Sequence, residues 1–162
     1  MPTVLIADDD ADHRELLHLA LRRFGYDVVE ATDARSAQDH LDAGRLDAIL
    51  LDVRMPGESG IEFCRRLRQN PAAATVPVMF VSADVNDHRI LDALRAGADD
   101  YLTKPFHRAE LGARLENLLR LRPGTAGRSA TAATAAMLAA RGAVHRPATA
   151  AVARPALDLK TA

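Results

Sequence analysis

Residues 46–57 read Leu46-Asp47-Ala48-Ile49-Leu50-Leu51-Asp52-Val53-Arg54-Met55-Pro56-Gly57. The first six of them have the apolar content of a buried strand, and Pro56-Gly57 is typical of a loop. Asp52 therefore stands at the carboxyl end of a strand, where Asp is disfavoured and where a buried charge costs free energy unless a partner compensates for it. This placement favours a functional role for Asp52 over a structural one.

A second apolar run ends in the same way. Residues 4–7 read Val-Leu-Ile-Ala and are followed by Asp8, Asp9 and Asp10. In open α/β sheets, ligands bind outside the carboxyl ends of the strands. Two acidic strand ends in one such sheet would converge on a hard cation, for which carboxylate oxygens are the preferred ligands.

The rest of the chain supplies the sheet. Apolar periodicity and turn residues predict strands at residues 4–7, 26–31, 46–51, 76–81 and 101–103, and helices at residues 12–24, 34–41, 60–69, 87–96 and 106–121. Ser59 and Glu62 have the spacing of a capping box, which marks the start of the third helix. Strands that alternate with helices predict an α/β fold, in which a parallel sheet has helices on both faces.

Composition is that of a globular protein. The chain has 162 residues, of which 48% are hydrophobic and 27% are charged, and its formal net charge is −1. No apolar run approaches the length of a membrane span, and no signal peptide precedes the first strand. The expectation is a soluble, cytoplasmic protein without a membrane contact. A single cysteine, Cys64, has the setting of a core residue in a helix.

After residue 122 the composition changes. Residues 123–162 contain fifteen alanines, three prolines, three glycines and no aromatic residue, and they carry a charge of +4 against −5 for residues 1–122. Such a segment buries too little apolar surface to offset its ordering entropy. The sequence therefore predicts a domain at residues 1–122 and a disordered tail at residues 123–162, in which alanine-rich residues 131–141 form at most a transient helix.

The predicted strand ends carry a set of groups suited to phosphoryl chemistry. They deliver Asp8 with Asp9, Asp52, Ser82 and Lys104. Carboxylates and a backbone carbonyl would hold Mg²⁺, which would neutralise an incoming phosphate. Asp52 could then act as the nucleophile, as carboxylates do when they form aspartyl phosphates. A lysine and a hydroxyl would contact the remaining phosphoryl oxygens.

This constellation resembles the receiver domain of two-component response regulators. The resemblance rests on four stretches within residues 1–122, which are Val4-Leu5-Ile6-Ala7-Asp8-Asp9-Asp10, Asp52-Val53-Arg54-Met55-Pro56, Val81-Ser82-Ala83 and Tyr101-Leu102-Thr103-Lys104-Pro105-Phe106. It implies a flavodoxin-like, doubly wound sheet of five parallel strands in the order 2-1-3-4-5, with five helices. One departure is visible, because the loop that usually reads Met-Pro-x-x-Asp-Gly ends here in Glu58-Ser59-Gly60, and Ser59 can replace Asp as a helix cap.

The resemblance also implies a role for each site residue. Asp52 would accept a phosphoryl group from a sensor histidine kinase or a phosphotransfer protein. Asp8 and Asp9 would form the acidic pair, with Mg²⁺ bound directly by Asp9, Asp52 and the backbone carbonyl of Arg54. The other implied roles are a switch hydroxyl at Ser82, a phosphate-binding lysine at Lys104, a switch aromatic at Tyr101, a cis peptide bond before Pro105, and positions that tune phosphoryl lifetime at Arg54 and Asp84.

Structural explanations exist for each residue taken alone. Asp8–Asp10 could cap the first helix, Lys104 could be solvated, Ser82 could start a helix, and Tyr101 could be an ordinary core residue. Placement of all of them at four strand ends favours the functional explanation. The six histidines show no zinc-binding spacing, so no zinc site is expected.

Three functions compete on this basis. The first is a stand-alone receiver, not an enzyme, that switches contacts with a downstream protein and can form a homodimer through the fourth helix, fifth strand and fifth helix. The second is a Mg²⁺-dependent phosphohydrolase of the haloacid-dehalogenase type, which needs a second acid pair after the lysine, whereas Asp99-Asp100 precedes Lys104. The third is a pseudo-receiver that is not phosphorylated. Residues 123–162 contain no helix-turn-helix pattern, so no DNA-binding domain is expected.

Overall fold

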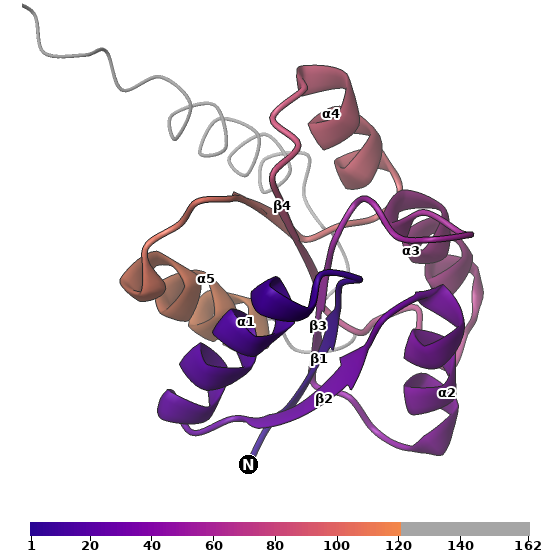
Figure 1. Ribbon diagram of the computed structural model, residues 1–162. Helices are drawn as coiled ribbons and strands as arrows, with labels where there is room; N and C mark the ends of the chain where they lie inside the picture. Colours follow the sequence, from indigo (N-terminus) through magenta and orange to yellow (C-terminus); the bar gives the residue numbers. More distant parts are fainter. Residues whose placement is uncertain (121–162) are drawn as a thin grey trace, which may run out of the picture.

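The computed structural model describes residues 1–120, in which strands and helices alternate along the chain (Figure 1). Within these residues the five strands are β1 (Thr3–Ala7), β2 (Asp27–Ala31), β3 (Ala48–Leu51), β4 (Val78–Ser82) and β5 (Asp100–Thr103). The five helices of the same region are α1 (Ala11–Arg23), α2 (Ala34–Ala43), α3 (Gly60–Gln69), α4 (Asp87–Arg95) and α5 (Arg108–Arg120). The predicted tail at residues 123–162 and its transient helix lie outside the described residues.

The strands form one parallel sheet in the order β2-β1-β3-β4-β5. The chain starts at β1 in the centre, moves to the β2 edge and then crosses to β3, β4 and β5. All strands therefore end at the same edge of the sheet, away from the N-terminus labelled in Figure 1. This topology confirms the predicted flavodoxin-like α/β fold.

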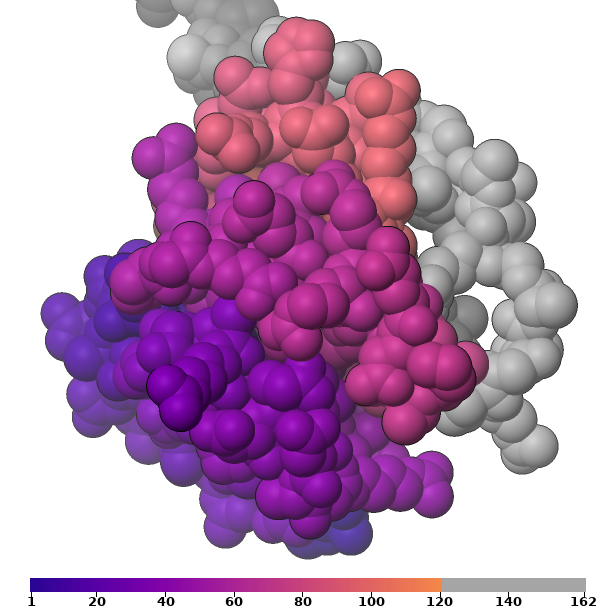
Figure 2. All heavy atoms as spheres, turned by 90° about the vertical axis from the view of Figure 1, so that its right-hand side faces the viewer, coloured from indigo at the N-terminus to yellow at the C-terminus, as the bar shows by residue number. Residues whose placement is uncertain are grey.

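Helices cover both faces of the sheet, as the wholly buried strands β3 and β4 require. α1 and α5 lie on one face, and α2, α3 and α4 lie on the other (Figure 1). Figure 2 looks onto the second face, where the three helices form a continuous surface. The larger core cluster lies beneath them.

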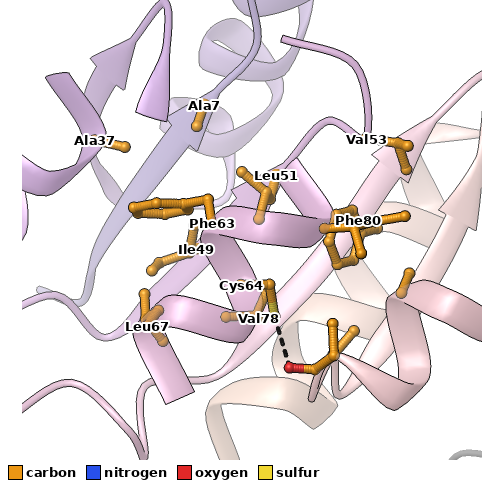
Figure 3. Close-up of a cluster of buried hydrophobic side chains, with 14 of the residues drawn as sticks. Ala7, Ala37, Ile49, Leu51, Val53, Phe63, Cys64, Leu67, Val78 and Phe80 are labelled. Carbon is orange, nitrogen blue, oxygen red and sulfur yellow. Dashed lines mark hydrogen bonds between the residues drawn. The ribbon is translucent and has the colours of Figure 1, made fainter. Parts of the chain in front are cut away.

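Side chains of α3 fill the centre of this larger cluster. Phe63, Cys64 and Leu67 point from α3 onto β3 and β4, next to Ile49 and Phe80 (Figure 3). Each of these side chains is at least 98% buried, and full burial of a large apolar side chain contributes about 1.5–3 kcal/mol. Cys64 is a buried free cysteine, as its sequence setting predicts.

Polar caps begin the helices next to the site. Asp10 is the N-cap of α1, where its side chain accepts the backbone N–H groups of Asp12 and His13. Ser59 and Glu62 form the predicted capping box of α3. Both caps satisfy N–H groups that a helix start leaves without a backbone partner.

Most element boundaries differ from the predicted ones by one or two residues, and two of these shifts have a local cause. β3 starts at Ala48 because Asp47 bonds to Thr3 through both its backbone N–H and its carboxylate, which accepts the Thr3 N–H at 2.8 Å. α5 starts at Arg108, since the carbonyl of His107 accepts the first N–H groups of the helix. The longest helices among residues 1–120 are α1 and α5, with 13 residues each, and none of the described helices could span a bilayer.

Candidate phosphoryl-acceptor site

Asp8 lies directly after β1 and is 1% exposed. Its two carboxylate oxygens have different partners: Oδ1 accepts the backbone N–H of Asp10 at 2.9 Å, and Oδ2 accepts the Lys104 ammonium at 2.8 Å. The Asp8 backbone is held as well, because its carbonyl accepts a hydrogen bond from Arg14 Nη1 at 2.9 Å. Arg14 is in turn paired with Glu30 at the end of β2, at 3.4 Å.

Asp52 follows β3 beside Asp8, and its side chain is 13% exposed. The backbone N–H of Asp52 donates to the carbonyl of Ala7, which extends the β1–β3 pairing to the acidic ends of both strands. The start of α3 packs against the same residue. A Cβ atom on Gly60 would lie 1.9 Å from the Asp52 carbonyl oxygen, so glycine is required for this close approach.

Three carboxylates converge at this edge. Among residues 1–120, oxygens of Asp8, Asp9 and Asp52 form a group in which all lie within 4.8 Å of one another. Clustered carboxylate oxygens suit a hard divalent cation such as Mg²⁺. Asp9 is exposed and Asp8 is buried, so the group opens towards solvent on one side.

Lys104 and Ser82 complete the edge from the other strands. The Lys104 ammonium lies 4.0 Å from Asp52 Oδ2, and its side chain is 10% exposed. The backbone N–H of Lys104 donates to the carbonyl of Ser82, which fixes the two strand ends relative to each other. The peptide bond between Lys104 and Pro105 is cis. Lys104 is therefore not a solvated surface lysine.

Burial raises the pKa of the Asp52 carboxyl above its ordinary value. The Lys104 ammonium opposes this by lowering the pKa, the negative charge of Asp8 raises it further, and hydrogen bonding by Ser82 and the Arg54 N–H lowers it. Burial dominates because desolvation disfavours the charged form of a carboxylate. A cation beside Asp8 and Asp52 would relieve both the desolvation and the repulsion.

A cavity of about 790 Å³ opens above Asp52. Its walls come from the loop after β3, the loop after β4, the start of α1 and the end of β5, and its lining residues are His13, Asp52, Arg54, Ser82, Ala83, Asp84, Val85, Asn86, Arg89 and Lys104. The lining combines one reactive carboxylate with cationic and hydroxyl groups. Such a set can receive a dianionic group and bind its oxygens.

Arg54 and Asp84 meet at the rim of this cavity, with Arg54 Nη2 at 3.5 Å from Asp84 Oδ2. The Arg54 side chain is 80% exposed, whereas that of Asp84 is only 9% exposed. The two partners therefore differ in exposure, and Asp84 is the nearly buried one. The Asp84 side chain is fixed in this position because its Oδ1 accepts a hydrogen bond from the backbone N–H of Asn86 at 3.0 Å.

Tyr101 lies beneath the loop after β4 and is fully buried. Its hydroxyl donates to the carbonyl of Asp84 at 2.6 Å, and its ring stacks on Phe80 with 6.1 Å between centroids. Burial raises the pKa of Tyr101 to about 12. Tyr101 is thus a core residue that also contacts the loop at the cavity.

The fold brings the residues predicted for the site together at the carboxyl edge of the sheet, where Asp8, Asp9, Asp52, Arg54, Ser82, Asp84 and Lys104 lie. Tyr101 is within β5 and reaches this edge through its hydroxyl. Sequence reasoning missed His13, whose Nδ1 lies 3.0 Å from the Lys104 ammonium, and Arg14. Both are in the first turn of α1. The sequence feature that could have identified both residues is their position just after the Asp10 cap, which places them next to the acidic end of β1.

Comparisons with known proteins agree with this geometry. The family described as "response regulator receiver domain" matches residues 4–116. The phosphate regulon transcriptional regulatory protein PhoB of Pseudomonas aeruginosa is 41% identical over 118 residues, which are 73% of this chain and 52% of that protein. The transcriptional regulatory protein CseB of Streptomyces coelicolor is 44% identical over 124 residues, 76% of this chain and 51% of that protein. The chain thus matches about half the length of these relatives.

Solved structures are similar over the same region. A putative response regulator from Chloroflexus aurantiacus superposes with a TM-score of 0.71 at 38% identity, covering 74% of this chain and 99% of that one. The receiver domain of a sensor histidine kinase from Pseudomonas aeruginosa, solved with a magnesium ion coordinated in the active site cleft, gives a TM-score of 0.69 at 31% identity, covering 74% and 98%. By sequence and by fold, this chain belongs to the response regulator receiver domain family.

Proposed function

We propose that this chain is a phosphoacceptor switch that takes a phosphoryl group on Asp52 from a sensor histidine kinase or a phosphotransfer protein. The observation that carries the proposal is the approach of Asp8, Asp9 and Lys104 to Asp52 beneath an open cavity. Because the chain belongs to the receiver family, a phosphohydrolase of the haloacid-dehalogenase type is no longer favoured as the alternative function. A pseudo-receiver would take up no phosphoryl group, which is a measurable difference.

The chemistry follows from the groups around Asp52. A carboxylate oxygen of Asp52 forms a bond to phosphorus while the bond from phosphorus to the donor's leaving atom breaks, and the donor leaves with that electron pair. Lys104 and the Ser82 hydroxyl line the same cavity as Asp52, and in this proposal they donate hydrogen bonds to the phosphoryl oxygens. Asp9, Asp52 and the Arg54 carbonyl would hold Mg²⁺, which supplies charge neutralisation for the incoming phosphate.

Intact mass spectrometry with a small donor such as acetyl phosphate tests the proposal. The wild-type chain should gain the mass of one phosphoryl group in the presence of Mg²⁺ and not after chelation. Asp52→Asn should gain none. Asp92→Asn is the matched control, because Asp92 is exposed on α4 and does not line the cavity. Stoichiometric phosphorylation of Asp52→Asn would show that Asp52 is not the phosphoryl acceptor.

The proposed output is a change in protein contacts on the surface of α4, β5 and α5, including a homodimer through that surface. This surface carries Arg114, which pairs within the chain with Asp100 at 2.8 Å and Glu110 at 3.1 Å. The three side chains are 16–36% exposed, so this partly buried cluster offers charged groups that a second chain could share. Analytical ultracentrifugation before and after phosphorylation measures the effect, and an unchanged sedimentation coefficient up to high concentration would exclude the dimer.

A further inference from the structure

The Lys104 ammonium has three N–H donors, and two of them already have partners. One donates to Asp8 Oδ2 at 2.8 Å, and another points to His13 Nδ1 at 3.0 Å. Asp52 Oδ2 lies further away, at 4.0 Å. An ammonium group that makes two hydrogen bonds has one N–H donor left. Because the three N–H bonds have a fixed geometry, the two bonded donors determine the direction of the third.

The distances around His13 also identify its tautomer. An ammonium group cannot accept a hydrogen bond, so a separation of 3.0 Å requires the lone pair of Nδ1 to face Lys104. The alternative is a protonated Nδ1 paired with a carboxylate, but Asp10 Oδ2 at 3.5 Å and Asp8 Oδ2 at 3.9 Å are both further from Nδ1 than the Lys104 ammonium is. His13 is therefore an acceptor at Nδ1, with the ring proton on Nε2.

Helix α1 holds the His13 ring in this place. The backbone N–H of His13 donates to Oδ1 of the Asp10 cap at 3.2 Å, so the residue is fixed at the first turn. Its ring lines the cavity above Asp52 and also a second cavity of about 360 Å³ formed with Leu16, Pro105 and Phe106. The side chain is 43% exposed, which leaves room for substitution without loss of core packing.

We propose that His13 is a positioning residue for Lys104: its Nδ1 accepts a hydrogen bond from one ammonium N–H and so directs the remaining donor towards the phosphoryl position at Asp52. This inference rests on the proposed phosphoacceptor function and assigns a role in it to a residue outside the carboxylate, hydroxyl and lysine set. Without the Nδ1 acceptor, the ammonium group rotates about its contact with Asp8. Fewer of its orientations then match an incoming phosphoryl oxygen.

Lysine side-chain NMR on the full chain can test this directly, because the sequence contains only two lysines, Lys104 and Lys160. With ¹⁵N-labelled lysine, the ammonium spectrum has two signals, and the signal lost in Lys160→Arg belongs to Lys160. Hydrogen-bonded ammonium protons exchange with water more slowly than solvated ones. We expect the Lys104 signal in Mg²⁺-free wild-type protein to exchange more slowly than the ammonium group of free lysine, because two of its donors are hydrogen-bonded.

Two substitutions separate the acceptor from the ring. His13→Phe keeps an aromatic ring but has no acceptor, and it should speed exchange at Lys104 by roughly two- to tenfold, as loss of one hydrogen bond predicts. His13→Asn lacks the ring but places an amide oxygen at the position of Nδ1, and it should keep exchange slow. His18→Asn is the matched control on the same helix, because His18 pairs with Glu30 away from the cavity.

Phosphorylation by a small donor provides the second readout. His13→Phe should slow uptake on Asp52 by roughly two- to tenfold, and His13→Asn should restore it to near the wild-type rate. Slow exchange at Lys104 in His13→Phe, or fast exchange in His13→Asn, would overturn the proposal. If wild-type protein takes up no phosphoryl group, the proposed function fails, and the ammonium spectra still decide whether His13 holds Lys104.

Discussion

The hydroxyl of Tyr101 donates a hydrogen bond to the backbone carbonyl of Asp84, with 2.6 Å between the two oxygens. The backbone N–H of Asp84 donates in the opposite direction, to the hydroxyl of Ser82 at 3.2 Å. Asp84 is therefore bonded on one side to a residue of the cavity and on the other to a buried ring of β5. This arrangement gives a contiguous path from Asp52 to the surface of α4 and β5.

The first prediction concerns this path. A phosphoryl group on Asp52 would draw the Ser82 hydroxyl away from Asp84 and shift a two-state equilibrium of the loop above Tyr101. Ser82→Ala should therefore still be phosphorylated but should lose the phosphorylation-dependent changes in the backbone amide spectra of residues 84–105. Spectral changes of wild-type size in Ser82→Ala would show that coupling takes another route.

Phosphoryl lifetime is the subject of the second prediction. The Arg54–Asp84 pair lies at the rim of the cavity, where it would partly cover the path of the hydrolytic water to the phosphoryl group. Arg54→Ala and Asp84→Ala should each speed autodephosphorylation, by up to about fivefold for a pair worth 0–1 kcal/mol. The double variant should be no faster than the faster single one.

Asp84→Asn is the control for that cycle, since an amide oxygen can still accept the Asn86 N–H and only the charge is lost. It should behave like Asp84→Ala. Additive rate effects in the double variant would mean that the two side chains act independently.

A third prediction follows from the pKa of Tyr101, which burial raises from 10.0 to about 12. In the unfolded chain Tyr101 ionises near its ordinary pKa, whereas the folded chain keeps its proton, so stability falls as pH rises above about 10. At pH 11 the loss from this group should be about 1 kcal/mol. Urea unfolding of wild type and Tyr101→Phe at pH 8 and pH 11 measures it.

The comparison with Tyr101→Phe removes the contribution of Tyr26, whose pKa burial also raises, because that residue is present in both proteins. Wild type should lose its stability advantage over Tyr101→Phe between the two pH values. An equal difference at pH 8 and pH 11 would contradict the raised pKa.

The fourth prediction concerns the opposite end of the sheet, where Arg68 of α3 is 11% exposed. Its guanidinium donates to the carbonyls of Gly97 at 3.0 Å, Ala74 at 3.1 Å and Val76, and to Asp99 Oδ2 at 3.0 Å. Arg68→Ala leaves these acceptors and the 6% exposed Asp99 side chain without the guanidinium. It should lower the free energy of unfolding by about 3–5 kcal/mol.

Arg65→Ala, on the exposed side of the same helix, is the control and should cost under about 0.5 kcal/mol. Phosphoryl uptake should be the same in both variants at a temperature where both are folded, because neither residue lines the cavity. A loss under 1 kcal/mol for Arg68→Ala would mean that water replaces the guanidinium at little cost.

Local sequence determined the elements and the chemical content of the site. Periodic apolar residues identify strands and helices because each element buries one face or stripe, and Ser59 with Glu62 identifies a helix start because capping is local. Acids, a hydroxyl and a lysine after apolar runs indicated the strand ends that carry the chemistry. The order of the strands came from the resemblance to a family, since periodicity does not state which strands are neighbours.

Tertiary structure alone decided which groups touch. Asp8 and Lys104 are 96 residues apart and bond only because β1 and β5 end at the same edge of one sheet. In the sequence, His13 belongs to no metal-binding pattern and has no evident role. In the structure, the start of α1 places its ring against the same ammonium group. Likewise the near-burial of Asp84 depends on the Tyr101 and Asn86 contacts. Local patterns encode burial and caps, whereas contacts between separate loops depend on how the whole sheet positions them.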